Sequence, residues 1–302
     1  MSEAMKILIL GGSGFVSGTL ARLALARGHQ VWAVTRGQRA LPQGVTGLAA
    51  DRHAGDEFMA AIQGAGVHWD LVVDCIAFEA ADIEQDVAVL TSLAGHLVMI
   101  SSDFVYDASR RRFPQAEEGE TTALGYGAKK RQAELALQAA HTGRMAWTVL
   151  RPCHIYGPGS LLGCLPTHGR DARLLERLRA GEALRLVGGG HFLQQPILAR
   201  DLAETILSLP GCPAAASQIF CAAGPDIVES REYYRLIAAV LGVELQVAEL
   251  PVDRYLAEHP EAEPFLCHRI YDLSKLRAAG AAVPATPLAQ GLREQVEHLL
   301  AH

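Results

Sequence analysis

The chain of 302 residues is long enough to bury a large core, and its 50% hydrophobic and 20% charged residues exclude intrinsic disorder. A net charge of −6 argues against a nucleic-acid binder that depends on bulk positive charge. The apolar runs are too short to cross a bilayer, the start shows no secretory signal, and the six cysteines form no C-x-x-C pair. We therefore expect a reduced, cytoplasmic globular protein without a membrane partner.

Short apolar strands alternate with helices through the first half of the chain. The hydrophobic pattern predicts strands at 6–10, 31–34, 46–50, 70–75, 97–100 and 147–150, and helices at 15–27, 56–63, 82–93 and 122–140. Gly28 suits the position after the first helix, where a left-handed residue ends it. Strands and helices of these lengths form right-handed β-α-β units, so we expect an α/β fold of the doubly wound, Rossmann type with a parallel sheet.

Beyond Pro152 the pattern is looser and rich in glycine and proline. Asp201 is predicted to cap the start of a helix, with Glu204 reaching back to the cap. A second helix start is predicted at 272–275. We interpret the second half as a smaller part with segments that return to the sheet.

A glycine-rich segment, 11–17, lies between the first predicted strand and helix and reads G-G-S-G-F-V-S. Gly11 permits a tight turn, and Gly14 lets the backbone approach a pyrophosphate held by the N–H groups and dipole of the helix N-terminus. Ser17 replaces the usual third glycine with another small residue. The context predicts a dinucleotide site rather than an ordinary turn. Its predicted residues are Gly11, Ser13, Gly14, Phe15 and Val16.

The end of the second strand indicates which dinucleotide binds. A site for NAD commonly places an acid there, whereas this chain has Thr35-Arg36-Gly37. Arg36 can pair with a 2′-phosphate, which favours NADP over NAD; a solvated or stacked Arg36 is the alternative. Asp51 and Arg52 end the third strand and are predicted to contact the adenine, although Asp51 capping the next helix would also explain its position.

Tyr126 and Lys130 are four residues apart on a predicted helix and so share one face. An ammonium near a phenol favours the phenolate and lowers its pKa from about 10, which suits proton exchange with a substrate oxygen. Ser102 ends the fifth strand, where an open α/β sheet borders its ligand crevice, and could bond the same oxygen. These three are the predicted catalytic residues; a surface Tyr-Lys pair is the alternative.

These motifs resemble the extended short-chain dehydrogenase/reductases, the NAD-dependent epimerase/dehydratase family. The matching segments run in order over almost the whole chain. Residues 11–17 are similar to G-G-T-G-F-I-G, 101–106 (S-S-D-F-V-Y) to S-S-x-x-V-Y-G, 126–130 (Y-G-A-K-K) to Y-G-x-S-K, 150–159 (L-R-P-C-H-I-Y-G-P-G) to L-R-x-x-N-V-Y-G-P-G, and 272–275 (D-L-S-K) to D-x-S-K.

The resemblance implies an NAD(P)-binding Rossmann domain at 1–160. It implies a mainly substrate-binding region at 161–302, with segments at about 191–222 returning to the sheet. Tyr126 would be the acid/base, and Lys130 would tune it and hold the nicotinamide ribose, so both also contact the cofactor. Ser102 would orient the reacting oxygen. The family further implies a small-molecule substrate, often a nucleotide sugar, a frequent acid at Glu134, and a homodimer through the helices near 82–93 and 122–140.

Departures from the family bear on the substrate. His154 stands where members that bind nucleotide sugars often carry Asn. Gln194 replaces an Arg that usually meets the diphosphate, and Arg269 lies where relatives hold anionic groups. Asp103 follows the catalytic hydroxyl, as an acid does in the dehydratases, but Phe104 replaces their Glu. The candidate substrate contacts are therefore Asp103, His154, Gln194 and Arg269; a packed His154 and an ion-paired Arg269 are alternatives.

The predicted function is that of an NAD(P)-dependent oxidoreductase or epimerase/dehydratase, which moves hydride at a carbinol or carbonyl carbon. No metal is predicted, because the Cys-His neighbours do not match zinc spacings. Two alternatives stay open: a nucleotide-sugar epimerase or dehydratase in the narrow sense, and a cofactor-sensing or RNA-binding relative without turnover. The second follows from Thr35-Arg36-Gly37 and Asp51-Arg52, which are similar to a branch that includes chloroplast stem-loop RNA-binding proteins.

Overall fold

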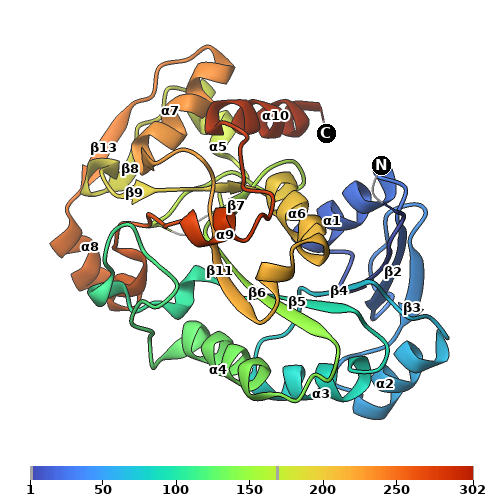
Figure 1. Cartoon of the computed structure of the whole chain (residues 1–302). Helices are drawn as coiled ribbons and strands as arrows, with labels where there is room; N and C mark the ends of the chain where they lie inside the picture. The colour runs from blue at the N-terminus through green and yellow to red at the C-terminus, as the bar shows by residue number, and fades with distance from the viewer. Residues whose placement is uncertain (1–2, 168–169, 302) are drawn as a thin grey trace.

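A seven-stranded parallel sheet forms the centre of the computed structural model, which describes residues 3–167 and 170–301 (Figure 1). The strand order is β11-β6-β5-β4-β1-β2-β3. From β1 the chain first adds β2 and β3 on one side and then β4, β5, β6 and β11 on the other, so the order reverses between β1 and β4. This order confirms the predicted doubly wound α/β class, in which ligands bind where the order reverses. The strands are β1 (Lys6–Leu10), β2 (Gln30–Thr35), β3 (Thr46–Ala49), β4 (Leu71–Asp74), β5 (His96–Ile100), β6 (Ala146–Pro152) and β11 (Gln218–Ala222).

Helices cover both faces of the sheet (Figure 1). One face carries α1 (Phe15–Ala26) and α6 (Ala199–Ser208), which pack against each other. The opposite face carries α2 (Gly55–Gly64), α3 (Ala80–Leu90) and α4 (Gly125–Ala139). Every strand and helix predicted in the first half is present within a few residues of its expected bounds. Gly28 follows α1 with a φ of +83°, as predicted.

The remaining elements form a smaller body beside the sheet, with a third apolar core of its own. Its strands pair as β7 (Ile155–Tyr156) with β10 (Ile197–Leu198), β8 (Leu184–Val187) with β13 (Val247–Leu250), and β9 (Leu193–Gln194) with β12 (Val228–Glu229). Its α-helices are α5 (Leu174–Arg179), α7 (Ser230–Leu241), α8 (Val252–Glu258) and α10 (Leu288–Ala301), whereas α9 (Ser274–Ala278) packs against β11 of the central sheet. Short 3₁₀ turns along the chain are η1 (Asp103–Val105), η2 (Ala108–Arg110), η3 (Gly188–Gly190), η4 (Leu209–Gly211), η5 (Pro213–Ala215) and η6 (Pro260–Phe265).

The start of α6 differs from the prediction. The helix begins at Ala199, so Asp201 lies in its first turn and is not its cap. The Asp201 carboxylate instead accepts hydrogen bonds from the backbone N–H groups of Ala285 and Thr286, at 2.9 and 2.7 Å. Glu204 pairs with Arg27 of α1. Both acids of the predicted capping box therefore bind residues distant in the sequence. The helix predicted to start at 272–275 is present as α9.

No helix in the described parts of the chain combines the length and apolar character needed to span a membrane.

The last strand of the central sheet, β11, pairs in parallel with β6 and brings the second half of the chain back to the sheet. The division into two domains at residue 160 stays a prediction.

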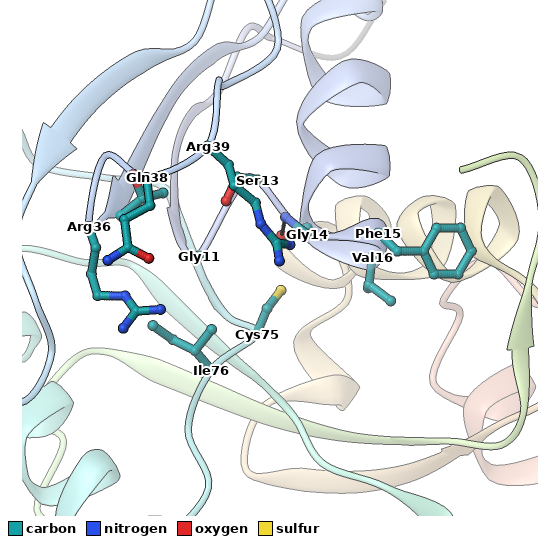
Figure 2. Close-up of a pocket in the computed structure, with 12 residues that line it drawn as sticks. Gly11, Ser13, Gly14, Phe15, Val16, Arg36, Gln38, Arg39, Cys75 and Ile76 are labelled. Carbon is teal, nitrogen blue, oxygen red and sulfur yellow. Dashed lines mark hydrogen bonds between the residues drawn. The ribbon is translucent and has the colours of Figure 1, made fainter. Parts of the chain in front are cut away.

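The turn from β1 to α1 depends on two glycines with left-handed backbone (Figure 2). Gly11 and Gly12 have φ values of +112° and +110°. A Cβ on Gly12 would lie 2.6 Å from the Cβ of Ala33, which real Cβ atoms do not approach. Ser17, in place of the third glycine, is buried, and its Oγ accepts the N–H of Gly14 at 3.1 Å. The turn therefore brings the backbone of α1 close to the sheet edge.

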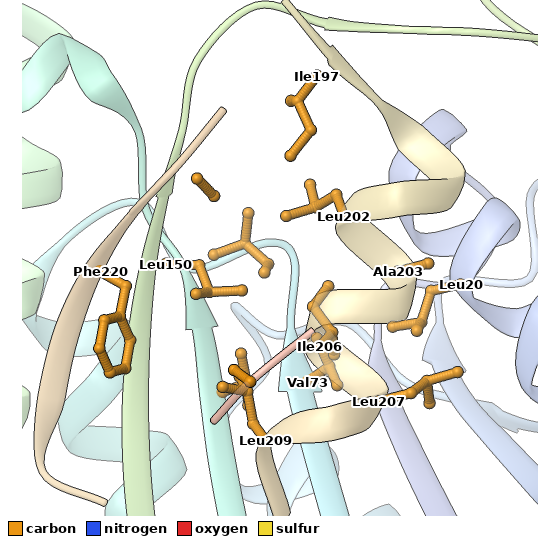
Figure 3. Close-up of a cluster of buried hydrophobic side chains, with 14 of the residues drawn as sticks. Leu20, Val73, Leu150, Ile197, Leu202, Ala203, Ile206, Leu207, Leu209 and Phe220 are labelled. Carbon is orange, nitrogen blue, oxygen red and sulfur yellow. The ribbon is translucent and has the colours of Figure 1, made fainter. Parts of the chain in front are cut away.

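The sheet separates two apolar cores because its side chains alternate between the faces. In β1, Ile7 and Ile9 contribute to the core under α1 and α6, whereas Leu8 and Leu10 contribute to the core under α2, α3 and α4. Figure 3 shows the first core, in which Leu202 and Ile206 of α6 approach the sheet. Each such buried side chain contributes about 1.5–3 kcal/mol, so the parallel sheet is a rigid base for the loops at its edge.

A buried histidine in β5 makes the fold sensitive to acid. His96 is 5% exposed, its Nε2 lies 2.8 Å from Thr148 Oγ1, and burial lowers its pKa to about 4. The unfolded chain keeps an ordinary His pKa of about 6.5 and so binds the proton first as pH falls. We expect the free energy of unfolding to fall between about pH 6.5 and 4 by up to about 3 kcal/mol because of this residue.

Chemical denaturation across this pH range, compared with the His96→Gln variant, measures the contribution. The variant should lose less stability than the parent on acidification. Identical pH dependence of the two proteins would show that His96 is not the group responsible.

Candidate active site

A cavity of about 460 Å³ lies over the turn between β1 and α1 (Figure 2). We call it the glycine-loop cavity. The first turn of α1 faces it with backbone N–H groups that a helix cannot bond internally. All five loop residues predicted to bind the cofactor line this cavity: Gly11, Ser13, Gly14, Phe15 and Val16. The structure therefore brings the predicted loop contacts together at a site whose donors suit a pyrophosphate.

Two arginines line the same cavity beyond β2. Arg36 was predicted here, whereas Gln38 and Arg39 were missed. Figure 2 shows Arg36 and Arg39 on different sides of the cavity, with the Arg39 guanidinium reaching toward the glycine loop. The signal for Arg39 was its place in the same strand-end loop as Arg36. The pair gives the lining of this cavity two positive charges.

A second cavity of about 290 Å³, the strand-end cavity, shares Gly11, Ser13 and Arg36 with the first. Asp51 and Arg52, predicted to contact adenine, both line it. One carboxylate oxygen of Asp51 accepts the N–H of His53 at 3.0 Å.

The guanidinium of Arg52 has buried protein partners, and its contact with adenine stays a prediction. It is 6% exposed, and its Nη2 donates to Asp74 Oδ2 at 2.7 Å and to Asp86 Oδ1 at 2.6 Å. Burial and the neighbouring Asp74 raise the pKa of Asp86 well above its ordinary value. Burial also opposes the charge of Asp74, but Arg52 and backbone N–H groups outweigh burial and hold the pKa of Asp74 below its usual range.

These carboxylates fix the loop after β4, which lines the cavities. Asp74 Oδ1 accepts the N–H groups of Ile76 and Ala77 at 2.6 and 2.8 Å. Asp82 Oδ2 accepts the N–H groups of Phe78 and Glu79 at 2.7 and 3.2 Å. Four consecutive backbone donors are thereby satisfied by acids that surround Arg52. The sequence offered a partial signal, since Asp74 ends a buried strand at the ligand edge of the sheet.

A third cavity of about 300 Å³, the tyrosine cavity, contains the predicted catalytic group. Ser102, Tyr126 and Lys130 all line it. It shares Phe15, Val16 and Cys75 with the glycine-loop cavity, so the two adjoin. The structure thus brings the three predicted catalytic residues together beside the predicted cofactor site.

The predicted lowering of the Tyr126 pKa is not met. Burial is the largest influence and raises the pKa of the phenol, a hydrogen bond with Ser102 lowers it, and the charge of Asp103 raises it again. Lys130 is turned away, since its Nζ donates to the carbonyls of Ala77 and Ile100 at 2.6 and 2.9 Å. Its Nζ lies 5.9 Å from the Tyr126 ring centroid. Tyr126 is consequently a protonated acid at neutral pH.

A buried ion pair anchors α4, which carries Tyr126 and Lys130, to the sheet. Glu134 is fully buried and accepts hydrogen bonds from Arg151 Nε and Nη2 at 2.9 and 2.7 Å. It also accepts the hydroxyl of Ser101 at 2.6 Å. Glu134 therefore ties α4 to the ends of β5 and β6, next to Ser102.

Arg269 is placed beneath the cavity, where it binds a protein carboxylate. It is 1% exposed, and its Nη1 donates to Asp103 Oδ2. Its Cζ lies 4.4 Å from the ring centroid of Phe104. Asp103 also accepts from the hydroxyl of Tyr271, and Arg111 lies 3.6 Å away. The structure therefore shows the ion-paired alternative for Arg269, whereas Asp103 also lines the tyrosine cavity, where its substrate contact stays a prediction.

The other two predicted substrate contacts are separated. His154 lines the tyrosine cavity and packs edge-on against the ring of Tyr233 at 6.0 Å. Gln194 is 1% exposed within β9, and the described lining of that cavity does not include it. Within residues 3–167 and 170–301, no group of three or more His, Cys, Asp or Glu side chains could hold a metal ion.

Removal of the Asp74 carboxylate should destabilise the fold, because Arg52 would keep a buried charge with fewer partners. We expect Asp74→Ala to lower the free energy of unfolding by about 3–5 kcal/mol, measured by urea denaturation. Lys129→Ala, which removes an exposed pair with Glu79 at 3.7 Å, is the control and should cost less than about 1 kcal/mol. Equal small losses would contradict a central role for Asp74.

Known proteins place this site in a family. The model of the NAD dependent epimerase/dehydratase family matches residues 7–215. A 2-alkyl-3-oxoalkanoate reductase of Stenotrophomonas maltophilia is 29% identical over 97% of this chain and 89% of that protein. The chloroplast stem-loop binding protein of 41 kDa b of Arabidopsis thaliana is 28% identical over 75% of this chain, which spans 61% of that protein's length.

Solved structures agree on the fold. The UDP-glucose 4-epimerase of Thermotoga maritima, solved with UDP-glucose, superposes with a TM-score of 0.77 at 19% identity, over 98% of this chain and 99% of that one. The family match covers both the glycine loop and the Ser102, Tyr126 and Lys130 segments. The chain therefore belongs to the NAD-dependent epimerase/dehydratase family, as its motifs predicted.

Proposed function

We propose that the chain is an NAD(P)-dependent oxidoreductase that reduces a carbonyl group or oxidises the corresponding alcohol. The observation that carries this proposal is the meeting of Ser102, Tyr126 and Lys130 in one cavity that adjoins the glycine-loop cavity. The Stenotrophomonas relative, matched over nearly the whole chain, bears the name of a reductase, which favours reduction over epimerisation.

The glycine-loop, strand-end and tyrosine cavities share lining residues, and we call the three together the groove. The residues that line the groove fit a dinucleotide. The close turn at Gly11 and Gly12 leaves the N-terminus of α1 open for a pyrophosphate. Lys130, which lines the tyrosine cavity, would hold the ribose next to the nicotinamide. When bound, the nicotinamide supplies the hydride or accepts it.

The chain's own residues control the oxygen of the substrate. In the direction of reduction, Ser102 donates a hydrogen bond to the carbonyl oxygen and polarises it. As hydride adds to the carbon, the oxygen takes the proton from Tyr126 Oη. The raised pKa of Tyr126 keeps that proton in place at neutral pH. Because Tyr126 is 48% exposed, water can return the proton after turnover.

Removal of the Tyr126 hydroxyl tests the acid. Tyr126→Phe should lower kcat for ketone reduction by about a hundred- to ten-thousandfold, because no other group delivers the proton. The affinity for the cofactor, measured by fluorescence titration, should stay nearly unchanged. Tyr255→Phe on α8 is the matched control and should retain full activity. Unchanged turnover in Tyr126→Phe would remove the phenol from the mechanism.

We also propose a preference for NADP, supported by the charges of Arg36 and Arg39, which both follow β2 and line the glycine-loop cavity. A 2′-phosphate accepts charge-assisted hydrogen bonds from guanidinium groups. Arg36→Gln and Arg39→Gln should each weaken NADPH binding about tenfold or more and leave NADH binding nearly unchanged. Arg179→Gln on α5 is the control. Equal losses for both cofactors would overturn the preference.

The name of the Arabidopsis relative supports a second candidate, RNA binding without turnover. The net charge of −6 and the three retained catalytic residues weigh against it. A gel shift with stem-loop RNA at physiological salt, beside a cofactor-oxidation assay with pooled ketones, distinguishes the two: an RNA complex with no oxidation would favour the second candidate.

A homodimer through α3 and α4 is proposed from the packing of these helices side by side and from Leu135 of α4, which is 48% exposed. Sedimentation equilibrium tests it, and a monomer at micromolar concentration would refute it.

A cytoplasmic location is proposed from the six cysteines, all of which are free thiols. Cell fractionation that recovers the protein outside the cytoplasm would contradict that location.

A further inference from the structure

A separate cavity of about 380 Å³ opens on the other side of Tyr126. It lies between η1 and η2, the start of α4, and η6 of the second half of the chain. We call it the side cavity. It shares Phe104 and Tyr126 with the tyrosine cavity, so the two cavities adjoin at these two side chains. The mechanism proposed above does not use this space.

Apolar side chains form the wall between the two cavities. The rings of Phe104 and Tyr126 meet edge-on at 6.3 Å, and those of Phe104 and Phe265 at 5.4 Å. Leu124, at the cap position of α4, is 80% exposed, and Tyr126 is 48% exposed. A large apolar side chain left in water beside a catalytic group gains stabilisation when a ligand covers it.

The charges around the side cavity exclude one class of ligand. Asp107, Glu261 and Glu263 line it, and its described lining contains no Lys or Arg. Arg269, beneath Phe104 and Pro264, is already paired with Asp103. Arg170, which lines the tyrosine cavity, lies over Phe15 of the glycine loop. A phosphate or carboxylate on this side of Tyr126 would therefore face acids and no free cation.

We propose that the side cavity binds an uncharged alkyl arm of the substrate, so that the substrate is an aliphatic ketone, or the alcohol formed from it. The ketone accepts a hydride at carbon and a proton from Tyr126 at oxygen, and the cofactor is oxidised. This inference rests on the proposed function and names its substrate class. It also disfavours a nucleotide sugar whose diphosphate would enter the side cavity, because that charge would meet Asp107, Glu261 and Glu263.

A chain-length series tests the arm. The full-length enzyme is assayed by NADPH and NADH oxidation with alkan-2-ones from butanone to decanone. Each methylene group that enters the side cavity should raise kcat/KM about threefold, the factor expected from burying CH₂. Keto acids of the same length with a carboxylate at the far end should react at least tenfold more slowly. No chain-length dependence, or turnover of UDP-sugars in preference to ketones, would overturn the proposal.

Two substitutions localise the effect. Leu124→Ser removes the apolar side chain and leaves a residue that favours the cap position of α4, so the fold should persist. It should raise KM for decanone about fivefold or more and leave butanone unaffected. Ile227→Ser, at an exposed side chain of the same size before β12, is the control. Glu263→Gln should raise kcat/KM for the keto acids severalfold, whereas Glu244→Gln should leave it unchanged.

A binding measurement separates this proposal from the proposed function. Calorimetry with decan-2-ol and NADP⁺-loaded protein should show binding that Leu124→Ser weakens and Ile227→Ser does not. Such binding without turnover of any ketone would refute the oxidoreductase and retain the alkyl site. Turnover of ketones with equal alcohol affinity in both variants would retain the oxidoreductase and refute the alkyl site.

Discussion

The buried contact between Arg52 and Asp74 is the interaction on which the groove depends. Asp74 ends β4 at the point where the strand order reverses, and its second oxygen accepts the backbone N–H groups of Ile76 and Ala77. The loop thus fixed contributes Cys75, Ile76 and Phe78 to the cavities. The carbonyl of Ala77 in this loop accepts a hydrogen bond from Lys130 Nζ. One ion pair therefore connects the strand-end cavity to Lys130.

Two other buried pairs fix the rest of the site in the same way. Glu134 and Arg151 tie α4 to the sheet, and Asp103 and Arg269 tie η1 to the second half of the chain. Buried charges that lose a partner are costly, so each pair restricts the backbone near it to one arrangement. The charges held in this way have protein partners, whereas Arg36 and Arg39 line the glycine-loop cavity and Arg170 lines the tyrosine cavity.

This distribution divides the groove chemically. The cofactor end presents backbone donors and guanidinium groups to a pyrophosphate, whereas the far side of Tyr126 presents aromatic rings and carboxylates. We propose an uncharged substrate for this chain from its compensated Arg269 and acidic side cavity, whereas a UDP-glucose 4-epimerase of the same fold was solved with UDP-glucose.

The sequence by itself determined the doubly wound fold, the glycine loop and the Ser102, Tyr126 and Lys130 group. Each depends on local pattern: periodic apolar residues, the backbone freedom of glycine, and the spacing of one helix turn. It also indicated Arg36, because a strand end faces the ligand edge of a parallel sheet. The start of α6 was misplaced because Asp201 and Glu204 have distant partners that no local pattern records.

Only the tertiary structure decided which charges face the groove and which compensate each other. Arg52 and Arg269 look like ligand-binding residues in the sequence, yet their partners are Asp74 and Asp103, at separations of 22 and 166 residues. The direction of the Tyr126 pKa shift follows from burial and from the carbonyls that hold Lys130, neither of which spacing reveals. Pairing and burial are properties of the packed chain, and for that reason the sequence predicted the catalytic groups but not their electrostatic surroundings.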